Sequence, residues 1–186
     1  MEQLFHKHII KITFIICLPL WIAFFCSKIQ ADDHNYSWHG HIIELNPELQ
    51  EAQYCMAKNI YFEAGNQPVA GKIAVAQVVQ NRVLNQNYPN NICDVVYQAK
   101  WKENWKGTLM PIRHMCQFSW FCDGKSDDPV DSATWMFSLL VADSVMNGEY
   151  GDITEGATHY HADSVYPYWA ESLNQTVIIN NHTFYK

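Results

Sequence analysis

Apolar residues at helical spacing mark the chain between residues 46 and 64. They are Cys55, Met56, Ile60 and Tyr61, which fall on one face of a helix. Asn46 and Pro47 are an N-cap and a first-turn proline, and Gly65 and Pro68 are residues that end helices. The pattern predicts a helix from about residue 46 to residue 64, with Glu63 at its C-terminal end.

Further helices are predicted downstream. Val69–Leu84 is apolar nearly all round, so this helix should lie at the centre of the domain. The turn before it is so short that the first two helices must pack side by side or cross closely, which places Glu63 at the rim of the pair. A short helix is expected over Ile92–Tyr97, and a third long helix from Asp128-Pro129 to near Met146.

The remaining segments have other patterns. Residues 98–114 contain tryptophans, glycine and proline and predict a long irregular loop, whereas the aromatic residues 116–122 predict a short strand. Over residues 157–162 successive side chains would point to opposite faces of a strand, with Thr158 and Tyr160 on one face and His159 and His161 on the other. Thr176–Ile179 and His182–Tyr185 flank Asn180-Asn181, which predicts a two-residue hairpin turn between two strands. The expected fold class is α+β, a helical lobe with one small antiparallel β-sheet.

The first 31 residues form a separate segment. Lys7 and Lys11 precede an uncharged apolar run, residues 12–26, and the segment ends at Ala31. This order is typical of a secretory signal peptide, and the run is shorter than the roughly 20 residues of a membrane span. We expect cleavage after Ala31, with an uncleaved N-terminal anchor as the alternative. Residues 32–50 are then a lead-in segment, and residues 51–186 are the main domain of a protein exported to the periplasm or the extracellular space.

The charge balance limits the possible partners. Without residues 1–31 the chain keeps 9 of its 12 basic and 18 of its 19 acidic residues, a net charge of −9 with neutral histidines. Nucleic-acid binding depends on cations that neutralise phosphates, so a nucleic-acid partner is not expected. Adhesion to an anionic lipid surface is not expected either, and membrane contact is limited to the N-terminal segment if it is retained. A monomer acting on a neutral or carbohydrate substrate fits this balance.

Four cysteines follow residue 31: Cys55, Cys93, Cys116 and Cys122. An even number in an exported chain favours two disulfides, with three possible connectivities, and Cys116 is close enough to Cys122 to close a short loop. Zinc binding is the rival interpretation, but the sequence has no C-x-x-C pair.

Glu63 is the candidate catalytic residue. A carboxyl beside the aromatic surface of Tyr61 and Phe62 is disfavoured as an anion, which raises its pKa and lets it keep a proton near neutral pH. Cleavage of a glycosidic bond needs a proton donor of this kind. The alternative is a surface glutamate that merely follows a buried face. A hydrolytic partner carboxylate would be Asp94, Asp123 or Glu155, and no motif singles one out.

His159 and His161 are candidates for a metal site, because alternate strand residues can present two imidazoles together. Nothing in the spacing of the neighbouring acids marks a third ligand, so polar residues lining a cleft are the favoured interpretation, and neither a metal nor another cofactor is expected. A cysteine nucleophile paired with one of these histidines would require a free thiol in an oxidising compartment.

A series of motifs between residues 52 and 186 resembles the cell wall hydrolase family, the SleB-type catalytic domain of spore cortex-lytic enzymes. The matching segments are Cys55–Ala64, Gly71–Val83, Tyr88-Pro89, Cys93–Gln98, Cys116–Gly124, Gly156–Ala162, Pro167–Trp169 and His182–Tyr185. They occur in the family's order. Residues 1–50 lie outside the resemblance.

The resemblance implies a lysozyme- or lytic-transglycosylase-like fold and cleavage of peptidoglycan glycan strands. By resemblance, Glu63 protonates the oxygen between N-acetylmuramic acid and N-acetylglucosamine and then acts as base for the muramic C6 hydroxyl, which closes on C1. Such a lytic transglycosylase needs one protein carboxyl. Further residues match family motifs and are expected to line the sugar cleft: Gln117, Phe118, Ser119, Thr158, His159 and Tyr160.

The chain departs from the family in one segment. Members usually have Glu-Ala-Arg-Gly-Glu-Pro after the first helix, where this chain has Glu63-Ala-Gly-Asn-Gln-Pro68. If the acid that Gln67 replaces assists catalysis in relatives, the turnover rate or the type of product of this protein is expected to differ from theirs. The competing functions are a plain muramidase with a second carboxylate, a non-catalytic glycan-binding domain, and a peptidase acting on the stem peptides.

Overall fold

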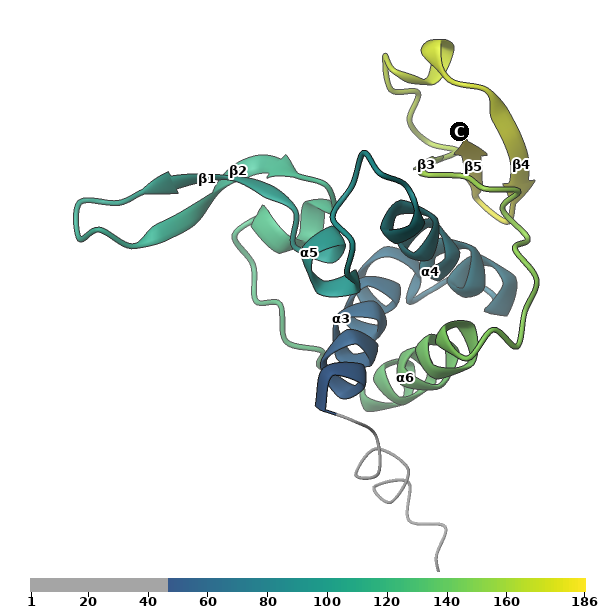
Figure 1. The fold of residues 1–186 in the computed structure, drawn as a ribbon, viewed down its shortest axis with the longest axis horizontal. Coiled ribbons are helices and arrows are strands. Elements are labelled where there is room, and N and C mark those ends of the chain that lie inside the picture. Colours follow the sequence, from purple (N-terminus) through teal and green to yellow (C-terminus); the bar gives the residue numbers. More distant parts are fainter. Residues whose placement is uncertain (1–46) are drawn as a thin grey trace, which may run out of the picture. The chain divides into compact units, whose positions relative to one another are not determined.

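The computed structural model describes residues 47–186 (Figure 1). The predicted signal peptide lies outside the described residues, as does nearly all of the lead-in segment. In the described part of the chain, no helix has the length and apolar character needed to cross a membrane.

Four α-helices confirm the helical predictions. They are α3 (Pro47–Ala64), α4 (Val69–Leu84), α5 (Ile92–Val96) and α6 (Ser132–Met146). Helix α6 begins slightly later than predicted because the carboxylate of Asp131, rather than Asp128, caps it by accepting a 2.7 Å hydrogen bond from the backbone N–H of Thr134.

Helix α4 lies at the centre of the domain, as its all-round apolar character predicts. On one side, Ile73 and Val79 pack with Met56 of α3 and Val141 of α6. On the other side, Ala74 and Val78 pack with Phe184 of the C-terminal sheet. Figure 1 shows α4 between the other long helices and that sheet. One helix therefore joins the helical lobe to the sheet.

The C-terminal sheet is antiparallel, with strand order β3-β5-β4. Its strands are β3 (His159–Ala162), β4 (Gln175–Ile179) and β5 (His182–Tyr185), and Tyr160 pairs with Phe184. Asn180 has φ 52°, which confirms the predicted hairpin turn with asparagine in the left-handed region. This sheet fixes the position of Tyr160 relative to the helices.

Two sequence predictions for residues 98–122 were wrong. The predicted loop over residues 98–114 is a β-hairpin of β1 (Ala99–Glu103) and β2 (Leu109–Cys116), and it forms a second, two-stranded antiparallel sheet. Both faces are largely exposed, so its sequence lacks the alternation of a half-buried strand. The strand predicted over residues 116–122 is instead the end of β2 followed by a 3₁₀-helix, η1 (Ser119–Cys122). A disulfide between Cys116 and Cys122 brings these ends together.

The second disulfide joins Cys55 of α3 to Cys93 of α5, so the structure selects one of the three connectivities. None of the four cysteines is a free thiol. The bond ties the central turns of α3 to the short helix that precedes the hairpin.

Lys72 stabilises the end of α3 that carries Glu63. Its buried ammonium group donates hydrogen bonds to the carbonyl oxygens of Ala64, Gly65 and Gln67, at 2.6, 2.6 and 2.9 Å. The last carbonyls of a helix have no partner within it, and the helix dipole makes this end negative. One lysine of α4 therefore satisfies the carbonyls of the turn between the first two helices.

We expect Lys72→Met to lower the free energy of unfolding by about 3 kcal/mol, because it removes a charged donor from three acceptors. Urea unfolding at neutral pH measures the change. Lys186→Met, at an exposed lysine bonded to a single carbonyl oxygen, is the control and should change stability by less than about 1 kcal/mol. Equal stability of the two variants would contradict the capping role.

Candidate active site

Glu63 occupies the last turn of α3, and its carboxyl is hydrogen-bonded to a residue of the C-terminal sheet. Its Oε2 accepts a 2.9 Å hydrogen bond from the hydroxyl group of Tyr160, which lies on β3. The two residues are 97 positions apart in sequence. The central position of α4 brings the helix end and the strand together, so the carboxyl is fixed by the fold as a whole.

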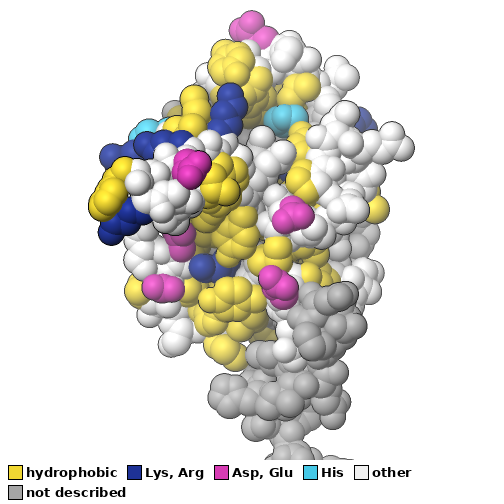
Figure 2. Space-filling model, turned by 60° about the vertical axis from the view of Figure 1, so that its left-hand side comes forward, with side chains coloured by type: hydrophobic (Ala, Val, Ile, Leu, Met, Phe, Trp, Pro, Cys, Tyr) yellow, Lys and Arg dark blue, Asp and Glu magenta, His cyan; other side chains and the backbone are white. Residues whose placement is uncertain are grey.

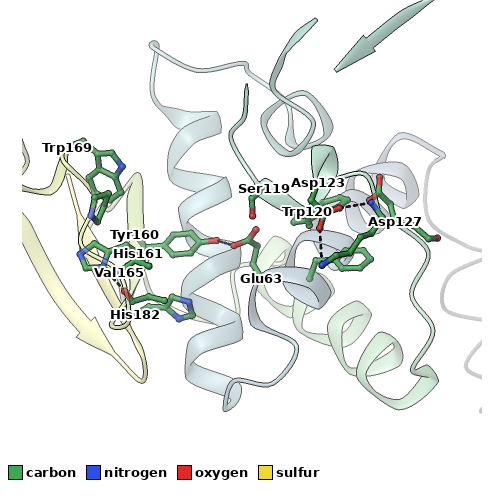
Figure 3. Close-up of a pocket in the computed structure, with 15 residues that line it drawn as sticks. Glu63, Ser119, Trp120, Asp123, Asp127, Tyr160, His161, Val165, Trp169 and His182 are labelled. Carbon is green, nitrogen blue, oxygen red and sulfur yellow. Dashed lines mark hydrogen bonds and ion pairs between the residues drawn. The ribbon is translucent and has the colours of Figure 1, made fainter. Parts of the chain in front are cut away.

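Both residues line a cavity of about 620 Å³. In Figure 3 the Glu63 carboxyl meets the Tyr160 hydroxyl in the middle of this cavity, with Ser119 close to the carboxyl. Aromatic and imidazole rings of the C-terminal region lie on one side, and Asp123 and Asp127 lie on the other. The cavity is large enough for part of a saccharide chain.

The aromatic wall beside Glu63 is built by neighbouring residues of α3 and η1. The ring of Trp120 stacks on Phe62, with centroids 4.8 Å apart. The indole N–H of Trp120 donates a 3.1 Å hydrogen bond to the side-chain oxygen of Asn59, which is fully buried. Asn59 lies one helical turn before Glu63 and thus holds the wall against the helix that presents the carboxyl.

Arg82 of α4 is buried near Glu63. Its guanidinium group lies over the rings of Tyr88 and Phe118, 5.4 and 5.0 Å from their centroids, and its Nε–H donates a 2.8 Å hydrogen bond to the carbonyl oxygen of Thr158. A cation enclosed by two rings is stabilised by their electron-rich faces. Arg82 places a positive charge beneath the site.

Burial raises the pKa of Glu63 above its ordinary value of 4.5, while the Tyr160 hydrogen bond and the charge of Arg82 oppose the increase. Burial and the neighbouring Glu63 carboxyl raise the pKa of Tyr160 well above its ordinary value, so its hydroxyl keeps its proton. The site therefore holds a carboxyl that favours the protonated form, beside a permanent hydrogen-bond donor.

The C-terminal wall of the cavity contains His161, Trp169 and His182. The Nε2 of His161 lies 2.9 Å from the hydroxyl oxygen of Tyr185, and its ring packs 5.9 Å from that of Trp169. Burial lowers the pKa of His182, which keeps this imidazole neutral near pH 7. Rings of this kind offer flat apolar faces and polar edges to a sugar.

Two carboxylates face the cavity from the other side. Asp123 lies 3.6 Å from Lys125, while burial raises the pKa of Asp127. Asp123 was one of the three candidates for a hydrolytic partner, and Asp127 was not recognised in the sequence. Asp94 and Glu155 do not line this cavity.

The structure brings three of the predicted site residues together in the cavity, namely Glu63, Ser119 and Tyr160. The remaining four do not line it. Gln117 is exposed at the end of β2, and Phe118 is buried beneath Arg82. Thr158 is buried and its hydroxyl lies 3.0 Å from Nδ1 of His159, whose ring packs against Trp169.

Several residues of the site were missed as site residues in the sequence: Phe62, Arg82, Trp120, Asp127 and His182. All of them except Asp127 belong to segments that resemble the family, and for Arg82 and Trp120 this was the only signal that could have found them. Among the residues that the structure describes, no group of three or more His, Cys, Asp or Glu side chains is arranged to hold a metal ion.

The segment that departs from the family forms a tight turn. A Cβ atom at Gly65 would overlap the carbonyl oxygen of Tyr61, so this turn requires glycine as it is built here. The amide of Gln67 donates a 3.3 Å hydrogen bond to Asn66, and its carbonyl oxygen accepts from Lys72. Gln67 does not line the cavity and thus supplies no second polar group to Glu63.

Comparisons with known proteins agree with this architecture. The family model described as Cell Wall Hydrolase matches residues 66–185, a span that begins just after Glu63. The catalytic domain of the Bacillus cereus SleB protein is 25% identical, with a TM-score of 0.54, and the match covers 74% of this chain and 91% of that domain. The catalytic domain of the germination-specific lytic transglycosylase SleB from Bacillus anthracis is 24% identical, with a TM-score of 0.55, covering 77% and 98%. No match was found among curated proteins.

The fold is thus that of an α+β, SleB-like enzyme, with four helices and two small antiparallel sheets in the described residues. The chain belongs to the cell wall hydrolase family. This membership implies peptidoglycan as the substrate. Together with the two disulfides, it indicates a location outside the cytoplasm.

The raised pKa of Glu63 predicts a pH-dependent difference in stability between the wild-type protein and Glu63→Gln. A raised folded-state pKa means that the folded protein holds this proton more tightly than the unfolded chain, whose value is near 4.5. The resulting stabilisation is complete below about pH 4.5 and is lost as the pH rises through the folded-state pKa. Glu63→Gln has no such proton to lose.

We therefore expect the two proteins to be similarly stable at low pH and the variant to be the more stable one at neutral pH. Urea unfolding between about pH 4 and pH 8 measures the difference. Glu51→Gln, at an exposed position on the same helix, controls for the change in net charge. A constant difference across this pH range would show that the fold does not favour the protonated carboxyl.

Proposed function

We propose that the protein is a lytic transglycosylase that cleaves the bond between N-acetylmuramic acid and N-acetylglucosamine in peptidoglycan, with Glu63 as general acid and then general base. The observation that carries the proposal is the Glu63 carboxyl itself. It is disfavoured as an anion by burial, lines a saccharide-sized cavity, and is oriented by Tyr160. The B. anthracis relative is described as a lytic transglycosylase.

In the first step, Glu63 donates its proton to the glycosidic oxygen as the C1–O bond breaks. The Tyr160 hydroxyl donates its hydrogen bond to Oε2, so in this proposal the proton for the substrate is carried by Oε1 of the same carboxyl. As the proton leaves, the carboxylate that forms is stabilised by the Tyr160 hydrogen bond and by the charge of Arg82. These two groups act on the anion, so they favour proton transfer more than they favour the resting acid.

In the second step, the Glu63 carboxylate accepts a proton from the C6 hydroxyl of the muramic acid residue, and the hydroxyl oxygen bonds to C1. The product carries a 1,6-anhydro ring, and the carboxyl returns to its protonated state. No water and no second carboxylate takes part. The aromatic wall of Phe62 and Trp120 limits the access of water to this face of the carboxyl.

Plain hydrolysis is the second candidate function, because Asp123 and Asp127 line the same cavity. Either could activate a water molecule for attack at C1. The peptidase alternative in its cysteine form is not supported, since all four cysteines of the described chain are in disulfides. We further propose that the protein is exported through its N-terminal segment and acts as a monomer on glycan strands.

Glu63→Gln should lower the rate of peptidoglycan cleavage by about 10²–10⁴-fold, because the variant has no proton to donate. The rate of soluble fragment release from purified peptidoglycan measures this. Glu51→Gln is again the matched control, with activity close to that of the wild type. Full activity of Glu63→Gln in a correctly folded protein would exclude Glu63 as the acid, and inactivity of the wild type would favour a glycan-binding role.

Mass spectrometry of the digest separates the two chemistries. We expect 1,6-anhydro-muramic ends, and we expect Asp123→Asn and Asp127→Asn to leave the type of product unchanged. Reducing muramic acid ends that depend on either aspartate would instead establish hydrolysis. Free stem peptides would establish a peptidase.

Tyr160→Phe should shift the pH dependence of activity. The hydroxyl stabilises the ionised form of Glu63, so its removal raises the pKa of Glu63 further. The activity of a general acid falls as the pH rises above its pKa, and the alkaline limb of kcat/KM reports that value. We expect this limb to move to higher pH in Tyr160→Phe and to stay in place in Tyr150→Phe, at an exposed tyrosine outside the cavity. A uniform loss of activity with an unshifted limb would assign Tyr160 a purely structural role.

A further inference from the structure

The β1–β2 hairpin concentrates positive charge on a negatively charged protein. Four of its residues are basic, namely Lys100, Lys102, Lys106 and Arg113, against the single acidic residue Glu103. Outside Ala99–Cys116, the described residues include 5 basic and 14 acidic side chains. Figure 2, in which the hairpin side of Figure 1 comes forward, shows Lys and Arg gathered in this region.

The same hairpin exposes large apolar side chains. They are Trp101, Trp105, Leu109, Met110 and Met115. Trp105, in the turn between the strands, is 89% exposed, and Leu109 at the start of β2 is 65% exposed. Yellow hydrophobic side chains lie among the blue basic ones in Figure 2. Large exposed apolar side chains concentrated on one element in this way point to an interaction site.

The hairpin is anchored to the rest of the domain at the end where β1 begins and β2 ends, while the turn between the two strands is exposed. Trp101 packs against Phe121, with ring centroids 5.9 Å apart, and the Cys116–Cys122 disulfide closes the lower end of β2. Beyond Trp101, Lys102 pairs with Met110 and Glu103 with Leu109 across the two strands. Successive side chains of a strand point to opposite faces, so Lys102 shares one face of the hairpin with Met110, and Glu103 shares the other with Leu109. None of the hairpin's cations forms a salt bridge with any described residue.

We propose that the β1–β2 hairpin is a membrane-docking arm that binds the surface of an anionic lipid bilayer, with the lysines on the headgroups and Trp105 and Leu109 in the interfacial layer. Charge complementarity carries the electrostatic part, since clustered lysines and arginines bind anionic lipid surfaces. Tryptophan prefers the boundary between headgroups and acyl chains. The net negative charge of the whole chain had predicted no such adhesion, but the fold segregates the positive charge onto one element.

The apolar side chains favour lipid over an anionic wall polymer. A soluble polyanion would bind the lysines, but it has no apolar surface for Leu109, Met110 and Met115. These apolar side chains are stabilised when they leave water. Lysines on edge strands also discourage sheet-to-sheet aggregation. That function does not require a tryptophan exposed at the turn.

Vesicle co-sedimentation tests the proposal with protein that lacks residues 1–31, because that segment could bind lipid by itself. Residues 46–186 form a compact unit, and both solved relatives are isolated catalytic domains. Wild-type protein should bind mixed vesicles that contain equal parts of phosphatidylglycerol and phosphatidylcholine. It should bind vesicles of phosphatidylcholine alone at least about ten-fold more weakly. Removal of three cations by K100Q, K102Q and K106Q should weaken partitioning by about 100-fold, at about five-fold per charge. Trp105→Ser should weaken it by about ten-fold.

Two exposed positions away from the hairpin serve as controls. Lys186→Gln matches the loss of charge, and Val130→Ser, at a valine that is 90% exposed, matches the loss of apolar surface. Both should bind like the wild type, and all hairpin variants should degrade soluble peptidoglycan fragments at the wild-type rate. Absence of wild-type binding to the anionic vesicles would overturn the proposal, as would equal binding by the hairpin variants. A third outcome is tight binding to inorganic polyphosphate, unchanged by Trp105→Ser, with no binding to vesicles. That result would overturn the lipid proposal and show that the hairpin binds a polyanion instead.

Discussion

The balance of forces on the Glu63 carboxyl is the constraint on which the rest of the site depends. Burial beside Phe62 and Trp120 favours the neutral acid, while the Tyr160 hydroxyl and Arg82 favour the anion. In the proposed mechanism, Glu63 first gives up a proton and later takes one back, and neither influence alone would serve both steps. Burial without a donor would make proton release costly, and a strong donor set without burial would leave the residue ionised before the substrate arrives.

Helix α4 is the element that makes this balance possible. It supplies Arg82 directly, it caps the Glu63 helix through Lys72, and its far side packs on the sheet that carries Tyr160. Three contributions to one carboxyl thus come from a single helix that is buried on all sides. Its apolar character therefore also positions the site, because a shift of α4 would move Arg82, Lys72 and the sheet that carries Tyr160.

The sequence predicted the long helices with a buried apolar face, but it failed for the exposed hairpin and for the short aromatic segment that forms η1. Helix α4 was bounded correctly because Val69–Leu84 is apolar and flanked by clear turn residues. The β1–β2 hairpin was taken for a loop because exposure on both faces removes the alternation that identifies a strand. Glu63 was proposed as the candidate acid from its local setting at an aromatic helix end. The direct contact with Tyr160 could not be found in this way, since it joins residues 97 apart and depends on how the sheet packs on α4.

The turn after Glu63 departs from the pattern of the family, yet the hydrogen bond between Tyr160 and Glu63 is present. The family pattern that the sequence resembles has arginine at the position of Gly65, and a Cβ atom there would overlap the Tyr61 carbonyl oxygen in the present backbone. The turn is built around glycine, and its carbonyl oxygens accept hydrogen bonds from the ammonium group of Lys72. Because Lys72 reaches the turn from α4, the position of the helix end is set by the core and not by the side chains of the turn. This explains how Gln67 can replace an acid in the sequence while the Glu63 carboxyl still meets Tyr160 in the cavity.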